Sequence, residues 1–447
     1  MNMRGPAHPG DLQRGAGGRK SIMKKNSIPP ATDGRAVWLR VGTLLDGVST
    51  KPLHNAHLLY DKDQILFVGE RSPADNLPDG RRKPDVDLPD CTLLPGLIEA
   101  HGHFFLEGSE LNPDKRAAYL KQAPKELLKA ALPRLEKLVR LGIIGVRDAG
   151  DKDGVGLALS KLYANGNRPL MPYVDSPGAA IHHKGGYGGF MAGPIEDFDT
   201  PASCVGARVR AGAHRIKLIP TGTINFKKGA VTSEPQMTTA EISELVNAAK
   251  SFGRQTFADA WGDWGIGRAI DGWVDSIEHG FFIRDDQLAK MRDRGIAWVP
   301  TIAPVQVQID HADVMGWDAK VVSNLKKILE QHAASLGKAH QMGVVVIAGS
   351  DAGSCGVAHG IGLLYELELM ERAGLPPLAV INSATGASSN RLGFGEKFGK
   401  IKAGHRSRFI VTSHSPLETV SNLGKQKTVV FDGGVLEGGK NFDSSGL

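Results

Sequence analysis

Hydrophobic and polar positions recur along this chain with two different periods. Residues 36–95 contain short runs in which apolar and polar positions alternate, separated by turn residues such as Asp-Gly and Asp-Lys-Asp. A period of two that is broken by turns predicts β-hairpins. A similar pattern returns near the end, in the stretches GKIKAGHRSRFIVTSHS and QKTVVFDGGVLEGGK. We therefore expect residues 36–95 and 397–447 to form one small β-sandwich domain together.

The long middle of the chain, residues 96–396, alternates short apolar runs with amphipathic stretches such as APKELLKAALPRLEKLVRLG, TTAEISELVNAAKSFG and GIGLLYELELMERAG. In the last of these, Leu363, Leu367 and Met370 follow the i, i+4, i+7 spacing of one helix face. The apolar runs predict eight buried strands, at Leu93–Ile98, Ile143–Val146, Leu170–Val174, Ile216–Ile219, Thr256–Ala258, Ser276–Ile277, Trp298–Ile302 and Val344–Ala348. Eight strand–helix repeats favour a parallel (β/α)₈ TIM barrel over residues 96–396. The alternative, a doubly wound open sheet, lacks a GxGxxG pattern after its first strand.

Ionisable side chains follow several of the predicted strands, where a barrel of this kind carries its functional groups. His101 and His103 come after the first run, and side chains at i and i+2 of an extended segment point to the same face. His279 follows the sixth run and Asp351 the eighth. Each has a simpler explanation when taken alone, because a histidine pair is often structural and an aspartate after a strand often caps a helix. Together they predict a nitrogen and oxygen site for a divalent cation such as Zn²⁺.

Lys217 lies inside the fourth apolar run, where an ammonium group is costly to bury. Burial lowers the pKa of a lysine and makes its neutral amine reactive. A lysine at this place could equally extend to the mouth of the barrel or pair with an acid. The position of Lys217 alone leaves both interpretations open.

Charge and cysteine content narrow the classes of function. The net charge of +6 is concentrated in residues 1–34, which hold six basic and two acidic side chains. We interpret residues 1–35 as a disordered basic leader, and we expect no nucleic-acid surface on the body of the protein. No apolar run is long enough to span a bilayer, and no secretory signal follows the basic segment. Three widely spaced cysteines predict no disulfide framework, so we expect a cytoplasmic protein.

Several motifs in this chain occur in a fixed order: LLPGLIEAHGHF, GVRDAG, IKLIPTG, GWVDSIEHGFF, VPTIAP, AGSDAG, HGIGLLYELELMERAG, INSATGASSNRLG and GKIKAGHRSRFIV. Over nearly the whole chain they resemble the amidohydrolase superfamily, in the branch of imidazolonepropionase and the metal-dependent Xaa-Pro dipeptidases. The resemblance implies that His101 and His103 bind the more buried metal and that His279 binds a second one. It also implies that Lys217 carries a CO₂-derived carbamate that bridges two metals. Asp351 would bind metal and transfer the proton.

The chain departs from the family pattern at the fifth strand. Family members carry a histidine ligand there, in a pattern like HAxG, whereas this chain has Asp259 in the sequence FADAWG. An aspartate can bind a hard divalent cation, although its side chain is shorter than that of histidine. The cofactor is therefore expected to be one or two divalent ions, with Zn²⁺ favoured and Asp259 a candidate ligand.

The expected reaction is metal-assisted hydrolysis of an amide bond in a dipeptide or an N-acyl amino acid, with Asp351 as general base and then general acid. The alternatives are a mononuclear hydrolase of cyclic amides or a deaminase on the same fold, and a catalytically silent barrel that binds a ligand. The expected partner is a small-molecule substrate, and a homo-oligomer is left open. Candidate substrate-binding residues lie in the Gly-rich loop after the third strand and after the eighth: His182, His183, Tyr187 and His359.

Overall fold

The computed structural model describes residues 27–77, 79–166, 170–394 and 397–438. Residues 1–26 of the predicted leader lie outside this range. Of the described residues that precede 36, Ile28 and Ala31 are buried in the core of the small domain. That domain therefore includes more of the chain than the predicted segment 36–95 plus 397–447.

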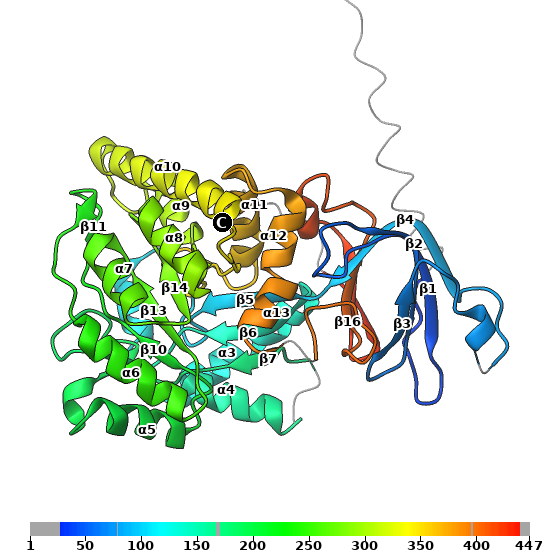
Figure 1. Cartoon of the computed structure of the whole chain (residues 1–447), viewed down its shortest axis with the longest axis horizontal. Coiled ribbons are helices and arrows are strands. Elements are labelled where there is room, and N and C mark those ends of the chain that lie inside the picture. Colours follow the sequence, from blue (N-terminus) through cyan, green and yellow to red (C-terminus); the bar gives the residue numbers. More distant parts are fainter. Residues whose placement is uncertain (1–26, 78, 167–169, 395–396, 439–447) are drawn as a thin grey trace, which may run out of the picture.

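The small domain is one seven-stranded sheet to which both halves of the chain contribute, in the order β18-β17-β16-β4-β1-β2-β3. Its strands are β1 (Val37–Leu44), β2 (Leu53–Tyr60), β3 (Ile65–Gly69), β4 (Val86–Pro95), β16 (Arg408–Thr412), β17 (Lys427–Phe431) and β18 (Gly434–Glu437). The rings of Tyr60 on β2 and Phe409 on β16 meet edge to face at 5.0 Å, although two strands separate them in the sheet. The sheet therefore curls around its own core, as the two-layered β-sandwich prediction requires (Figure 1).

The larger domain is the (β/α)₈ barrel that the eight apolar runs predict. Seven of its eight strand positions are formed, in order, by β5 (Leu97–Gly102), β6 (Ile143–Asp148), β7 (Tyr173–Asp175) together with β8 (Ala180–His182), β10 (Ile216–Leu218), β13 (Thr256–Ala260), β14 (Ser276–His279) and β15 (Ala297–Val299). The pairs β5–β6, β6–β7, β8–β10, β10–β13, β13–β14 and β14–β15 are all parallel. The eighth position is taken by residues 345–348, which bond to β15 through Trp298 and to β5 through Ala100.

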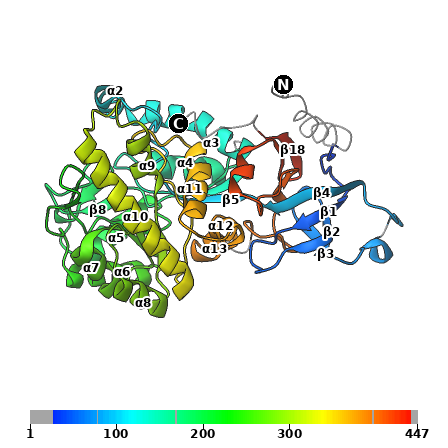
Figure 2. The same cartoon turned by 90° about the horizontal axis from the view of Figure 1, so that it is seen from above.

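The barrel helices cover the outside of the strands (Figures 1 and 2). They are α2 (Pro113–Tyr119), α3 (Pro124–Arg140), α4 (Val155–Ala164), α5 (Pro201–Ala211), α6 (Thr239–Ser251), α7 (Gly262–Asp271), α8 (Asp285–Arg294), α9 (Ala303–Asp310), α10 (Ala319–Met342), α11 (Ile361–Arg372), α12 (Pro377–Ser383) and α13 (Gly386–Arg391). Smaller elements are β9 (Ala192–Pro194), the hairpin β11 (Ile224–Asn225) and β12 (Ala230–Val231), and the 3₁₀ turns η1 (Ala74–Asn76), η2 (Ile195–Asp197) and η3 (Val420–Gly424). Leu363, Leu367 and Met370 on α11 are fully buried, which confirms the helix face read from their spacing.

The observed strands differ from the predicted runs by a few residues at their ends, and two of the runs are also divided between elements. The run Leu93–Ile98 is divided, because Leu93 to Pro95 finish β4 of the small domain and the barrel begins at Leu97 on β5. The third run is replaced by β7 and β8, which are separated by a turn that contains Gly178 at φ 63°. His182 therefore lies on a barrel strand, whereas the sequence predicted a loop.

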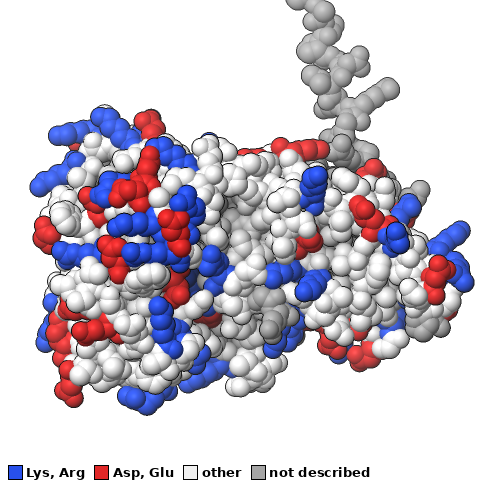
Figure 3. Space-filling model, in the orientation of Figure 1, with Lys and Arg blue, Asp and Glu red and all other residues white. Residues whose placement is uncertain are grey.

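Positive and negative side chains are interspersed over the face of the barrel seen in Figure 3. This face therefore lacks the continuous basic surface that a nucleic acid needs. Within the part of the chain that the structure describes, no helix is both long and apolar enough to cross a membrane.

Candidate metal centre

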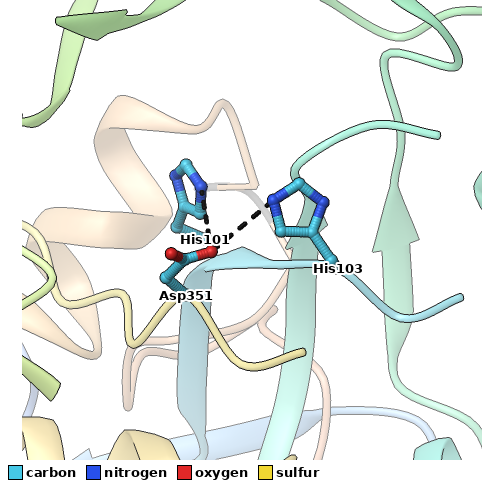
Figure 4. A group of neighbouring side chains, drawn as sticks. All are labelled: His101, His103 and Asp351. Carbon is cyan, nitrogen blue, oxygen red and sulfur yellow. Dashed lines mark ion pairs between the residues drawn. The ribbon is translucent and has the colours of Figure 1, made fainter. Parts of the chain in front are cut away.

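Three donor side chains converge at the carboxyl end of β5 (Figure 4). His101 and His103 are separated by one residue and project to the same side of the extended chain, while Asp351 arrives from the segment after the eighth strand position. Asp351 Oδ1 lies 3.7 Å from His101 Nε2 and 3.5 Å from His103 Nε2. The three residues are at most 9% exposed, so the group forms a buried, mixed nitrogen and oxygen cluster.

A second donor group shares His101 with the first and adds Asp259 and His279. Asp259 comes from β13 and His279 from β14, which are neighbouring parallel strands. His279 Nε2 lies 3.4 Å from Asp259 Oδ1. Within each group all donor atoms are within 4.8 Å of one another, so the two groups form adjacent candidate sites with one residue in common.

The far sides of the three imidazoles are held by hydrogen bonds. His101 Nδ1 is 2.7 Å from Glu278 Oε2, His103 Nδ1 is 3.1 Å from the carbonyl oxygen of Gly150, and His279 Nδ1 is 2.8 Å from Thr301 Oγ1. These contacts orient each ring and leave its Nε2 atom facing the cluster. Burial, together with the charge of Lys217, lowers the pKa of His103 to about 3, so this ring is neutral at pH 7 and can donate a lone pair.

Glu278 is fully buried and joins this arrangement to the barrel interior. Besides His101 it accepts hydrogen bonds from Arg147 Nη2 at 2.6 Å and from Ser276 Oγ at 2.6 Å. Burial alone would raise the pKa of Glu278, but the Arg147 charge and the His101 hydrogen bond lower it to about 2. An ionised Glu278 therefore fixes the orientation of His101.

Lys217 is 1% exposed and lies on β10, with its Nζ atom 3.0 Å from Asp259 Oδ2. Burial would raise the pKa of Asp259, but the charges of Lys217 and His279 outweigh it and bring the pKa far below its usual range. The prediction from sequence left open whether Lys217 pairs with an acid, and the structure contains that pair. The acid is the residue that replaces the expected histidine.

The donor groups fit a divalent cation on the evidence of their unsatisfied atoms. Among the described residues, His101 Nε2 and Asp259 Oδ1 are buried without a hydrogen-bond partner. Buried polar atoms nearly always have partners, and two unsatisfied ones in one donor group indicate that another group completes the site. Imidazole nitrogen and carboxylate oxygen are donors that Zn²⁺ and similar ions accept.

A cavity of about 490 Å³ opens above the donor groups. Its floor includes His103, Asp259, His279 and Asp351, and its walls are mainly apolar. The wall side chains include Leu106, Leu120, Phe190, Met191, Ile224, Phe226, Trp261, Phe281 and Val305. A cavity of this size, with polar groups gathered at one end, fits a small organic substrate.

The four predicted substrate-binding residues are placed differently from one another. Tyr187 lines the cavity and packs edge to face on Trp261 at 5.6 Å. His183 lies apart from the cavity lining and pairs with Glu196 at 2.7 Å and with Glu241 at 3.1 Å. His182 is buried on β8 and does not line the cavity.

His359 is buried away from the cavity, and its Nε2 atom bonds to the carbonyl oxygen of Leu106 at 2.8 Å. This geometry is that of a core histidine that supports the loop after β5. Of the four residues, the arrangement supports a substrate contact only for Tyr187.

Sequence reasoning missed residues that have no motif of their own. Neither Glu278 nor its partner Arg147 had an assigned role. Arg116, on α2, also lines the cavity. The signal that could have indicated Glu278 is its alternation with Ser276 along one strand, which places both side chains on the same face of the sheet.

Comparisons with known proteins agree with this fold. Residues 92–436 match the model of the amidohydrolase family. The ochratoxinase of Aspergillus niger is 24% identical over 450 residues, which cover 96% of this chain and 91% of that protein. A solved Xaa-Pro dipeptidase with methionine bound in its active site has a TM-score of 0.75 and 26% identity, covering 90% of this chain and all of that one. The crystal structure of A. niger ochratoxinase has a TM-score of 0.75 at 21% identity, covering 91% and 96%.

The family match extends over more than three quarters of the chain and includes every strand of the barrel. The motif order, the barrel with its two-part small domain and the paired donor groups all lead to one assignment. The chain belongs to the amidohydrolase family and is a hydrolase.

Proposed function

We propose that this protein uses one or two divalent cations, with Zn²⁺ favoured, to hydrolyse the amide bond of a dipeptide or an N-acyl amino acid. The observation that carries the proposal is the pair of donor groups that share His101 at the floor of a cavity. The proposed ligands are His101, His103, Lys217 as a carbamate, Asp259, His279 and Asp351. A cation bound there lowers the pKa of water and polarises a carbonyl group.

Asp351 is the group we assign to proton transfer. Its side chain borders the cavity, and its Oδ2 atom accepts a hydrogen bond from Ser354 Oγ at 2.7 Å while Oδ1 faces the two histidines. The carboxylate can therefore take a proton from the attacking water and return it to the leaving nitrogen, first as base and then as acid. Tyr187 also lines the cavity and can hold the substrate in place.

The class of substrate rests on the relatives and on the cavity. The related proteins are named for cleaving ochratoxin and Xaa-Pro dipeptides. The cavity offers apolar walls for a hydrophobic side chain or acyl group, with the polar donors limited mainly to its floor. An amide whose two sides are a hydrophobic acyl group and an amino acid matches both features.

The Lys217–Asp259 pair favours a second candidate, a mononuclear hydrolase of cyclic amides or a deaminase. The Nζ atom of Lys217 lies 3.0 Å from Asp259 Oδ2, and a lysine engaged in such an ion pair has no free lone pair with which to take up CO₂. His101, His103 and Asp351 would then hold a single cation. Metal content separates the candidates, because about two ions per chain support the carbamate-bridged centre and one ion supports the alternative.

The test combines metal content with turnover of N-acyl amino acids, dipeptides, cyclic amides and aminated bases by the metal-loaded full-length protein. We expect the first two classes to be hydrolysed. His101→Ala should lose both metal and activity while its circular dichroism stays native, and His54→Ala, an exposed histidine on β2, should lose neither. Full turnover by His101→Ala would refute the proposed centre, and turnover of cyclic amides or bases alone would favour the second candidate.

Asp259→His tests the role of the fifth strand directly. If Asp259 is a weakened ligand, restoring the longer imidazole should raise both the metal content and the turnover. The same exchange removes the carboxylate beside Lys217, and intact-mass measurement at raised bicarbonate would then detect an added CO₂. No change in metal content or mass would show that Asp259 does not limit the second site.

A further inference from the structure

Arg116 lies on α2 at the boundary between the catalytic cavity and a second cavity of about 460 Å³. Leu106, Arg116 and Leu120 line both cavities. The helix begins after Asn112, whose side chain accepts hydrogen bonds from two backbone N–H groups, and Pro113 occupies its first turn. Tyr119 near its end donates to the carbonyl oxygen of Phe105 at 3.0 Å. The element that carries Arg116 is therefore fixed at both ends.

The guanidinium group of Arg116 is held by neutral carbonyl oxygens. It donates to Glu110 O at 3.3 Å and to Gly353 O at 2.9 Å. Throughout the described residues, no carboxylate lies within 4.0 Å of the guanidinium group. The carboxylate of Glu110, the residue whose carbonyl oxygen Arg116 contacts, pairs instead with Lys115 at 3.4 Å. A guanidinium group has five N–H donors, and these two contacts leave several of them available for another acceptor.

Arg116 is the one permanent cation in the described lining of the catalytic cavity. The other basic side chains there, His103 and His279, are proposed metal ligands. The neighbouring wall is apolar, and this lowers the effective dielectric constant around the guanidinium group and strengthens its attraction for an anion. A carboxylate matches its planar fork better than other anions of similar size, except phosphate.

The location of Arg116 fits the geometry of an amide substrate. Gly353, which accepts its hydrogen bond, is two residues from Asp351, so their Cα atoms are at most about 7.6 Å apart. Asp351 is the group assigned to protonate the leaving nitrogen. In an N-acyl amino acid that nitrogen is attached to the carbon that carries the α-carboxylate. A substrate oriented for proton transfer from Asp351 therefore directs its carboxylate toward the same side of the cavity as Arg116.

We propose that Arg116 binds the α-carboxylate of the substrate and so restricts the enzyme to amides with a free carboxylate on the leaving amino acid. This inference rests on the proposed amide hydrolysis and deepens it. It predicts that cyclic amides and amides of neutral amines, which lack that carboxylate, are poor substrates. Binding at this point is independent of which metal is present.

The kinetic test compares N-benzoyl-L-phenylalanine with N-benzoyl-L-phenylalaninol, which has the same scissile amide and no carboxylate. We expect the native enzyme to prefer the acid at least ten-fold in kcat/KM. Arg116→Leu should abolish this preference and Arg116→Lys should retain part of it. Lys115→Leu is the matched control, because it removes one positive charge from the same helix, and it should retain the full preference.

A binding test distinguishes failure of this inference from failure of the proposed function. L-phenylalanine and L-phenylalaninol are titrated into the metal-loaded protein, and binding is followed by the fluorescence of Trp261 in the cavity wall or by calorimetry. The native protein and Lys115→Leu should bind the amino acid at least ten-fold more tightly, and Arg116→Leu should bind both compounds equally. If no amide is hydrolysed but this pattern holds, the proposed reaction fails and the carboxylate site stands. Equal binding by the native protein, no binding at all, or a preference that survives in a folded Arg116→Leu variant would overturn the inference.

Discussion

Glu278→Gln is the change whose effect can be worked out most fully from the structure. Glu278 is fully buried and accepts hydrogen bonds from His101, Arg147 and Ser276. Glutamine keeps the shape and one acceptor oxygen but removes the charge. Arg147 is 1% exposed and would remain as a buried cation that has lost its direct carboxylate partner. Breaking one side of such a pair costs about 3–5 kcal/mol of unfolding free energy.

The predicted loss should be visible in thermal unfolding. An unfolding entropy of about 2.1 cal/mol/K per residue gives about 0.9 kcal/mol/K for 447 residues, so the loss corresponds to about 3–5 °C in Tm. A second effect follows at the metal centre, because Glu278 orients His101. Loss of such a partner usually weakens metal affinity about 10–100-fold, which competition with a metal buffer would measure.

The double variant Glu278→Gln with Arg147→Met is the internal control. It removes the uncompensated charge together with its partner, so the double variant should lose clearly less free energy than the sum of the two single changes. Additive losses would show that the two side chains are not energetically coupled. Unchanged metal affinity in Glu278→Gln would show that Glu278 does not orient His101, and either result would refute the reasoning.

Two further predictions concern pH and the cavity wall. Burial lowers the pKa of His359 to about 4 from its ordinary 6.5, so its contribution to stability is full above pH 6.5 and is lost as the pH falls toward 4. Between pH 7 and pH 5, His359→Gln should therefore lose about 2 kcal/mol less unfolding free energy than the native protein in urea titrations, and parallel losses would contradict this. Trp261 packs against Tyr187 and His279, so Trp261→Ala should raise KM several-fold. Trp264 is 70% exposed, so Trp264→Ala should leave KM unchanged. Equal effects of the two substitutions on KM would exclude a specific role for Trp261 in the cavity wall.

The barrel could be predicted from sequence because its strands are buried on both faces and its helices on one. The difference between a continuous apolar run and an i, i+4, i+7 pattern is visible in single segments such as Ile143–Val146 and 360–374. The strand bounds could not be predicted as well. Residues 345–348 fill the eighth position with bridges to Trp298 and bonds to Ala100, and nothing local separates such a segment from a regular strand.

The candidate donors were accessible from sequence for a related reason. His101, His103, His279 and Asp351 each follow an apolar run, and parallel topology brings the ends of such runs together. Their supporting contacts were not accessible, because each depends on a residue far away in the chain. His101 and Glu278 are 177 positions apart, and Arg116 and Gly353 are 237 positions apart. No periodicity in the sequence encodes contacts at such separations.

The backbone at the site shows how the fold accommodates these donors. His279, Thr301 and Asp351 have φ values of 67°, 48° and 54°, a left-handed conformation that glycine adopts readily and a β-branched threonine seldom does. Each such residue costs about 1–3 kcal/mol and persists only where its surroundings fix it. Here Trp298 Nε1 donates to the carbonyl oxygen of His279 at 2.9 Å, and Asp351 N donates to the carbonyl oxygen of His101 at 2.8 Å. Glycine at these positions would relieve the strain, but it has no side chain to bind a cation or to form a hydrogen bond with a ligand. The side chains of these three residues, and not the stability of the turns, therefore account for their presence.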